Sequence, residues 1–386
     1  MNAVQQGIVT LIRSAITGKG YPLPADFRLE EAEELIIRHQ IVGLSYEGAL
    51  LCGLDNGSPA MRRLFQLYSQ VVYRNNTQMA AVDKIMAAFE KENIDYLPVK
   101  GSVLKGLYPK PAMRVMTDAD ILIRLTQKDK ITACMEALGY KEHMITDHEW
   151  TWNSRELCCE LHTQLVPDFH VDYFHYTADG WQQSLQTGHC RYDLSPEEHY
   201  VFLFIHYAKH YRGRGIGLRQ IVDLQVFHRA YPQLDMDYVA ERIEQCRLTA
   251  FYQNTLRVLE NWFAEGPEDE ITEHITQYIF RSGSWGTREQ YAIAEAAQYA
   301  IGNRSAGYSR NRVFWQKIFP PMWIMKNQFP VLRKAPWLLP VFWPIRWVTI
   351  VLFRRSKLRQ FRHKRAFWSD EKITDYQQSL EYVGLR

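Results

Sequence analysis

The sequence is poor in cysteine, and the few cysteines that it has form no recognisable motif. Six are scattered along 386 residues without CxxC spacing, which argues against a cysteine-based metal site or a disulfide framework. The adjacent pair Cys158 and Cys159 is poorly placed for a routine structural disulfide. We therefore expect reduced thiols in a cytosolic protein at Cys52, Cys134, Cys158, Cys159, Cys190 and Cys246.

The sequence also has little net charge and no long apolar run near its N-terminus. Lys and Arg number 46 against 43 Asp and Glu, which leaves a net charge of +3 and argues against a protein dedicated as a whole to nucleic acid. Ahead of Arg13 the only apolar run is Ile8 to Ile12, which is too short for the apolar part of a signal peptide or for a membrane span. We therefore expect a cytoplasmic location.

The length and the periodicity of the chain predict several regions. A chain of 386 residues exceeds one ordinary core, and apolar residues recur at helical spacing both early and late in it. The longest helix is expected from near Pro59 to Glu90. We predict an N-terminal helical region, a core with strands, a helical domain and an aromatic, basic helical region at residues 1–93, 94–190, 191–313 and 314–386.

After Asp95 the pattern changes to strands that alternate with helices. Thr126 to Asp129 has the pattern of a capping box at the start of a helix. This order of elements predicts a small α/β unit. Its strands are expected at residues 96–99, 118–125, 148–152 and 157–165, with a turn at 153–155 between the last two.

A glycine turn with nearby cations gives the first chemical signal. An apolar run ends at Lys100-Gly101-Ser102, where a glycine lets backbone N–H groups approach phosphate oxygens and a helix start adds a positive dipole end. Lys105 and Arg114 follow closely enough to neutralise phosphate charge, although surface cations are also ordinary. We predict that a nucleotide's phosphates are bound by Lys100, Gly101, Ser102 and Arg114.

Carboxylates give the second signal. Asp118 and Asp120 stand two residues apart in a predicted strand, so their side chains share one face, about 7 Å apart at the backbone. Glu160 shares a face of a later strand with Cys158 and His162, and pairing of the two strands would bring it beside the aspartates. Three such carboxylates can hold Mg²⁺ for phosphoryl or nucleotidyl transfer; the alternative is a set of ordinary solvated acids.

Two residue pairs in the later helices allow more than one interpretation. His206 and His210 are one helical turn apart, and without an HExxH context they are either packed histidines or part of an acceptor site. Asp223 lies four residues after Arg219. It either pairs with that arginine within the helix or contacts a nucleotide or acceptor.

The stretch from 336 to 365 is rich first in tryptophan and then in basic residues. Such a composition is typical of contact with an anionic membrane surface or a partner protein, but aromatic helices also pack against neighbouring domains. Both interpretations stay open. The residues concerned are Trp337, Trp343 and Trp347, followed by Arg354, Arg355, Lys357, Arg359, Arg362, Lys364 and Arg365.

These motifs together resemble a known superfamily. Gly101-Ser102 followed by Asp118-x-Asp120 resembles the nucleotidyltransferase fold, and Glu160-Leu161-His162 matches a later acidic strand. The resemblance implies an α+β fold with a small mixed β-sheet core and large helical additions at both termini. A longer form of the motif is most similar to the bacterial family labelled uncharacterised nucleotidyltransferases. It comprises Lys100-Gly101, Leu104, Tyr108, Arg114 and Asp118 to Leu122.

The resemblance also implies a reaction. An NTP would donate its NMP group to a hydroxyl or phosphate of a small-molecule, protein or RNA acceptor, with Mg²⁺ as cofactor and release of pyrophosphate. Asp118, Asp120 and Glu160 would be the catalytic metal ligands, and Glu160 would help to deprotonate the acceptor. The alternative is a catalytically idle nucleotide-binding or scaffold protein that recruits a partner or a membrane surface through residues 336–365, at the inner face of the membrane.

Overall fold

The computed structural model describes residues 1–146, 148–166, 179–298, 314–315, 317–353 and 366–385. The chain forms two compact units, and each is described by itself. Unit 1 comprises residues 1–209 and 216–284, and unit 2 comprises residues 210–215 and 285–386. The four-part division expected from the sequence stays a prediction.

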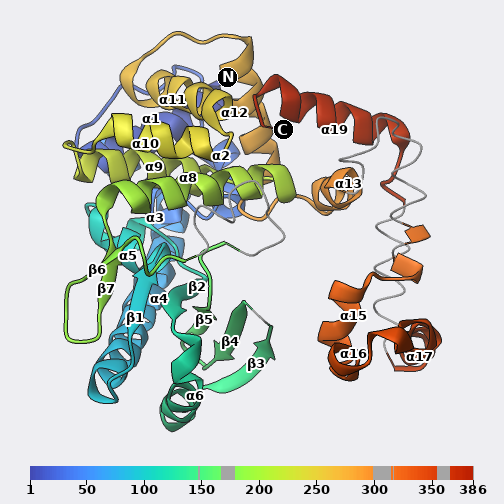
Figure 1. Ribbon diagram of the computed structural model, residues 1–386. Coiled ribbons are helices and arrows are strands. Elements are labelled where there is room, and N and C mark those ends of the chain that lie inside the picture. Colours follow the sequence, from blue (N-terminus) through green and yellow to red (C-terminus); the bar gives the residue numbers. More distant parts are fainter. Residues whose placement is uncertain (147, 167–178, 299–313, 316, 354–365, 386) are drawn as a thin grey trace. The chain divides into compact units, whose positions relative to one another are not determined.

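Four helices precede the sheet of unit 1 in the chain. The last of them, α4, begins where it does because the Ser58 hydroxyl accepts a hydrogen bond from the Met61 N–H and because proline fits the first helical position. It confirms the predicted long helix, ending one residue later than expected. The four are α1 (Ala3–Thr17), α2 (Leu29–Arg38), α3 (Val42–Leu51) and α4 (Pro59–Lys91) (Figure 1).

Five strands form one mixed sheet with the order β1-β2-β5-β4-β3. β2 and β5 run parallel, and the other neighbouring pairs run antiparallel. This small mixed sheet among many helices confirms the predicted α+β class. The strands are β1 (Tyr96–Val99), β2 (Asp118–Ile123), β3 (Lys141–Ile145), β4 (Glu149–Asn153) and β5 (Cys158–His162).

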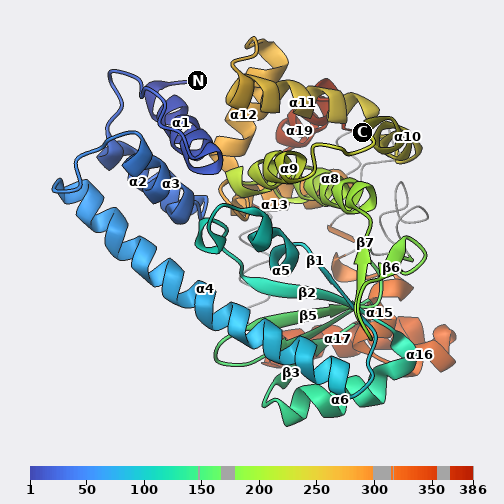
Figure 2. The same cartoon turned by 90° about the vertical axis from the view of Figure 1, so that its left-hand side faces the viewer.

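One face of the sheet packs on α4 and on α6 (Lys128–Ala137), as Figure 2 shows. Ala119, Ile121 and Ile123 of β2 are buried in the same apolar cluster as Ile85 of α4. Because successive side chains of a strand alternate between faces, the even-numbered residues of β2 point away from these helices. The aspartates of β2 therefore lie on the face that the helices leave free for polar groups.

Two local predictions in this region are wrong, and one strand has no predicted counterpart. β2 ends at Ile123, since Leu125 begins the 3₁₀ turn η3 (Leu125–Gln127). Gln127 precedes α6 without a side-chain hydrogen bond, so Thr126 to Asp129 is not a capping box. β3 has no counterpart among the predicted strands, because all five of its residues are exposed at the sheet edge and it lacks the apolar alternation of a half-buried strand.

Short helical segments connect β1 to β2, and a hairpin and further helices complete unit 1. Ser195 caps α8 by accepting a hydrogen bond from the Glu198 N–H at 3.3 Å. The last turn of α8 belongs to unit 2. These elements are α5 (Gly101–Leu104), η1 (Lys105–Leu107), η2 (Pro111–Met113), β6 (Ser184–Gln186), β7 (Tyr192–Leu194), α8 (Pro196–Gly213), α9 (Leu218–Ala230), α10 (Met236–Gln245), α11 (Thr249–Ala264) and α12 (Glu270–Ser282).

Unit 2 is helical in its described parts. Within it, the Trp368 indole N–H donates to the Ala292 carbonyl at 3.1 Å, which joins the segment before α19 to α13. Its elements are α13 (Arg288–Gln298), α15 (Met322–Gln328), α16 (Val331–Lys334), η4 (Pro336–Leu338), α17 (Leu339–Phe353) and α19 (Asp370–Tyr382).

The tryptophans near α17 have two kinds of surroundings. Trp343 and Trp347 donate their indole N–H groups to the carbonyls of Pro320 and Ile318, at 2.9 and 2.7 Å, whereas Trp337 is 77% exposed. The basic residues predicted to follow, 354–365, lie outside the described residues. Among the parts of the chain that the structure describes, no helix combines the length and apolar character needed to cross a bilayer.

Candidate active site

The site begins at Lys100, directly after β1. The register of β1 and β2 sets Val99 opposite Asp120, and Lys100 adopts φ 50° and ψ −117°, an uncommon backbone conformation for a residue other than glycine. Its ammonium group lies 2.6 Å from Oδ1 of Asp120. Burial favours the neutral amine, but the charge and hydrogen bond of Asp120, together with the charges of Asp118 and Glu160, raise the pKa of Lys100. Lys100 and Asp120 therefore form an ion pair.

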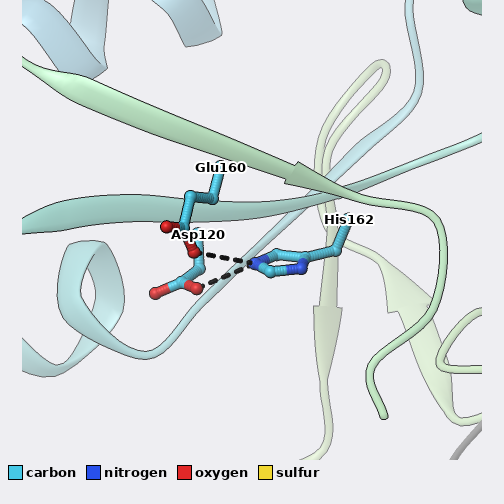
Figure 3. Close-up of side chains that lie close together, drawn as sticks. All are labelled: Asp120, Glu160 and His162. Atoms are coloured by element: carbon cyan, nitrogen blue, oxygen red, sulfur yellow. Dashed lines mark hydrogen bonds and ion pairs between the residues drawn. The ribbon is translucent and has the colours of Figure 1, made fainter. Parts of the chain in front are cut away.

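Asp120, Glu160 and His162 converge at one point (Figure 3). The parallel register of β2 and β5 sets Asp120 opposite Glu160, and His162 follows on the same face of β5. Nε2 of His162 lies 2.8 Å from Oδ1 of Asp120 and 3.8 Å from Oε2 of Glu160. One donor atom from each residue lies within 4.8 Å of the other two. The predicted pairing of the two acidic strands is thus confirmed.

The acids of this face influence one another's ionisation. Burial and the negative charges of Asp120 and Asp118 raise the pKa of Glu160 to about 8. Burial and Asp120 raise the pKa of Asp118 as well. Burial also opposes ionisation of Asp120, but the Lys100 ammonium and a hydrogen bond with His162 hold its pKa below the ordinary value. Such an excess of negative charge favours a bound cation.

The donor set fits a divalent metal ion. Carboxylate oxygens suit Mg²⁺ and Mn²⁺, and an imidazole nitrogen suits transition metals. Asp118 is on the predicted face, where the Thr117 hydroxyl donates to its carboxylate at 3.3 Å, but it is not one of the three residues that converge. The sequence places His162 on the same face of its strand as Glu160 but assigns it no role. Its spacing of two residues from Glu160 is the sequence feature that could have identified it as part of the cluster.

The Arg114 side chain packs against the glycine turn and pairs with Asp223. Its Nε and Nη2 donate to the two carboxylate oxygens of Asp223 at 2.9 and 3.0 Å, and the Tyr108 hydroxyl donates to the same carboxylate at 2.7 Å. A Cβ on Gly101 would come within 2.9 Å of Nη1 of Arg114. Arg114 therefore packs directly against Gly101 of the turn. Its predicted contact with phosphate stays a prediction.

The remaining predicted residues divide between site and scaffold. The Ser102 hydroxyl donates to the Val99 carbonyl at 3.2 Å, within the turn. Lys105 is buried and donates to Asn75 and to the Arg114 carbonyl, both at 2.6 Å. Burial and neighbouring arginines lower the pKa of Lys105 to about 7. Its contacts make it a structural residue rather than part of the acidic cluster.

Two expectations for the helices can be compared with contacts. Arg219 donates to the Val115 carbonyl at 2.9 Å, and Asp223 pairs with Arg114, so the predicted ion pair within the helix is wrong. The rings of His206 and Phe202 are 6.4 Å apart, as expected for a packed histidine. A role for His206 and His210 in lining an acceptor site stays a prediction. All six cysteines are free, as expected.

Comparison with known proteins adds independent information. A solution structure of the antibiotic-resistance factor ANT(2'')-Ia is 15% identical, with a TM-score of 0.33, over 50% of this chain and 99% of that chain. A crystal structure of ANT(2'')-Ia in complex with adenylyl-2''-tobramycin is 14% identical, with a TM-score of 0.33, over 44% and 96% of the two chains. These similarities are too low to bear on function, and no curated protein matches the chain.

A comparison with models of protein families gives a match over more than half of the chain. The model of the uncharacterised nucleotidyltransferase family matches residues 26–264, more than half of the chain. The match includes the glycine turn, both acidic strands and α9 with Asp223. The chain therefore belongs to the uncharacterised nucleotidyltransferase family and is a nucleotidyltransferase.

Proposed function

We propose that this protein transfers the NMP group of an NTP to a hydroxyl or phosphate of an acceptor, releases pyrophosphate and uses Mg²⁺ as cofactor. The family supplies the reaction class. The observation that carries the metal dependence is the convergence of Asp120, Glu160 and His162 within 4.8 Å of one another, beside the turn at Lys100. A cluster of this charge and spacing is suited to a divalent cation and a polyphosphate substrate.

The proposed reaction is an in-line displacement at the α-phosphorus. An acceptor oxygen forms a bond to that phosphorus, the bond to the bridging oxygen breaks, and pyrophosphate leaves. When bound, a divalent cation neutralises phosphate charge and lowers the pKa of an acceptor hydroxyl. Glu160 takes the proton of that hydroxyl, as the most exposed carboxylate of the acidic cluster. Asp118 and Asp120 supply the further carboxylates.

Lys100, Gly101, Ser102 and Arg114 are proposed to bind or position the phosphates. Lys100 is supported best, because its ammonium already lies at the acidic cluster, 2.6 Å from Asp120. If Asp120 held a cation, the Lys100 ammonium would be available to a phosphate oxygen. Gly101 is proposed to let the backbone N–H groups of the turn approach the phosphates, and Arg114 to hold the turn through its packing against Gly101.

The acceptor can be a small molecule, a protein or an RNA, and one experiment addresses all three. The protein is incubated with an isotopically labelled NTP, Mg²⁺ and each acceptor class, and the products are examined by mass spectrometry. We expect the acceptor to gain one NMP group and pyrophosphate to appear in equal amount. Absence of pyrophosphate release with every NTP and acceptor tested would count against the proposed reaction.

The second candidate function is a catalytically idle nucleotide-binding or scaffold protein. The observation that favours it is an apolar face on α17, where Val341, Ile345, Val348 and Leu352 are all exposed at helical spacing. Calorimetry with Mg²⁺ and a panel of NTPs separates the two candidates. Metal-dependent binding followed by pyrophosphate release favours the enzyme, whereas no metal-dependent binding favours the scaffold.

The same face carries a proposal about location. We propose that α17 lies against the inner membrane surface from the cytoplasmic side, as a peripheral contact. Trp337, in η4 directly before α17, is 77% exposed as well. The sequence from 354 to 365 contains seven Arg and Lys residues, whose charge is complementary to anionic lipid headgroups.

A further inference from the structure

The imidazole of His162 faces both carboxylates of the acidic cluster. Its Nε2 lies 2.8 Å from Asp120 and 3.8 Å from Glu160 (Figure 3). Two ligands of one metal ion, each at a bond length of about 2.1 Å, lie about 3 Å apart when adjacent and about 4 Å apart when opposite. The two separations measured from Nε2 are close to these values, and a carboxylate oxygen of Asp120 lies within 4.8 Å of one of Glu160. The three donor atoms are therefore near enough to one another to bind a single ion.

The backbone fixes this arrangement without a metal. Asp120 and Glu160 are opposite each other in the parallel pairing of β2 and β5. His162 follows Glu160 by two residues, so it projects from the same face of β5. β2 and β5 are interior strands, each with a neighbour on both sides. A site built on interior strands holds its side chains with little freedom.

A simpler role for His162 would be to orient Asp120 by a hydrogen bond. Oδ1 of Asp120 also accepts a hydrogen bond from the Lys100 ammonium at 2.6 Å, so Asp120 already has another group that orients it. The same nitrogen of His162 also points toward Glu160, which a residue that only oriented Asp120 would not require. Side-chain exposure is 5% for Asp120, 14% for His162 and 24% for Glu160, so the cluster opens toward solvent on the Glu160 side.

We propose that Nε2 of His162 is a direct ligand of the divalent cation, together with Asp120 and Glu160, and that this site binds Mn²⁺ in preference to Mg²⁺. The proposal rests on the metal dependence of the proposed function and refines it. Mg²⁺ strongly prefers oxygen ligands, whereas Mn²⁺ and later transition ions accept an imidazole nitrogen readily. One nitrogen among the three protein ligands therefore shifts selectivity away from Mg²⁺.

Pulsed electron paramagnetic resonance of the Mn²⁺ complex tests the ligand assignment without any reaction. In the unsubstituted protein, without nucleotide, we expect the ¹⁴N coupling of a directly bound imidazole. His162→Gln should abolish that coupling and raise the Kd for Mn²⁺ by on the order of 10- to 100-fold. His143→Gln, the same change at an exposed histidine on β3, should leave coupling and affinity unchanged. Absence of coupling in the unsubstituted protein, or its persistence in His162→Gln, would overturn the assignment.

Competition between Mn²⁺ and Mg²⁺ tests the metal preference. His162→Asp replaces nitrogen by oxygen and should reduce the preference for Mn²⁺ by at least about tenfold; an unchanged ratio of affinities would overturn the preference. A nucleotidyl-transfer assay with both metals separates this inference from the proposed function. Transfer without nitrogen coupling would overturn the ligand assignment alone, whereas nitrogen coupling without transfer by either metal complex would overturn the proposed function alone.

Discussion

Arg114 and Asp223, which are 109 residues apart in the sequence, are joined by two hydrogen bonds in the interior of unit 1. Both side chains are less than one tenth exposed. Arg114 lies just before β2, and Asp223 lies on α9. α9 is thus tied to the residue that packs against Gly101 of the turn, although Asp223 is not one of the three residues of the acidic cluster.

Asp223→Ala should destabilise unit 1 by about 3 to 5 kcal/mol, because it leaves the buried guanidinium of Arg114 without its partner. Urea unfolding measures this change. Asp83→Ala, at an exposed position on α4, is the control and should change stability by less than about 0.5 kcal/mol. The double change Arg114→Met with Asp223→Leu should recover much of the loss. Equal stability of Asp223→Ala and the control would contradict the importance of this ion pair.

Asp120→Asn should reduce NMP transfer by at least about 100-fold while the fold is kept, since asparagine retains the shape but loses the charge that a cation requires. Asp120→Ala should abolish transfer as well. Pyrophosphate release measures activity, and circular dichroism reports the fold. Asp129→Asn, at an exposed position in the first turn of α6, should retain full activity. A folded Asp120 variant that keeps its activity would rule out the proposed mechanism.

Gly101→Ala should weaken NTP binding and destabilise the protein by about 1 to 3 kcal/mol. Its Cβ would lie 2.9 Å from the Arg114 guanidinium and 2.9 Å from the Met116 side chain, so either these side chains or the turn must shift. Gly106→Ala is the matched control, because its Cβ would meet no atom within 4 Å. Calorimetric titration with an NTP and thermal unfolding compare the two variants. Identical behaviour would show that the turn tolerates a side chain.

Stability should fall in acid because His39 is buried as a neutral ring. Its Nδ1 accepts the Leu218 N–H at 3.2 Å, and its Nε2 lies 3.1 Å from the Phe280 carbonyl. Burial lowers the pKa of His39 from 6.5 to about 4. The unfolded chain therefore takes up a proton first, and this contribution is complete above pH 6.5 and is lost as the pH falls toward 4.

Protonation of His39 should lower the free energy of unfolding by up to about 3 kcal/mol over this pH range. Urea midpoints measured across this pH range should depend less steeply on pH in His39→Gln, which does not titrate, than in the unsubstituted protein. The His143→Gln protein, changed at an exposed histidine, should keep the full dependence. A slope in His39→Gln equal to that of the unsubstituted protein would show that other groups cause the acid sensitivity.

Replacing apolar residues on α17 tests the proposed membrane contact. Val341→Asp with Val348→Asp should reduce binding to phosphatidylcholine vesicles that contain phosphatidylserine by at least about tenfold, because both side chains are exposed on the proposed face. Cosedimentation measures the bound fraction. Leu185→Asp, at a 65% exposed leucine of β6, should bind like the unsubstituted protein. If the unsubstituted protein does not cosediment with anionic vesicles, the proposed membrane contact is excluded.

Several features of this protein follow from the sequence alone because they depend on neighbours along the chain. The long helix α4 follows from its apolar spacing and from Ser58 and Pro59 at its start. The shared face of Asp118 and Asp120, and that of Glu160 and His162, follow from the two-residue period of a strand. The family also follows, since its motif is carried by such local patterns.

Only the tertiary structure decides which of these residues meet. The register of β2 and β5 sets Asp120 opposite Glu160, and it turns two separate acidic strands into one cluster that includes His162 but not Asp118. Arg114 pairs with Asp223 on a distant helix, whereas sequence spacing suggested Arg219. Strand register and buried ion pairs depend on the packing of segments far apart in the chain, because the energy of each contact exists only after both partners are desolvated together.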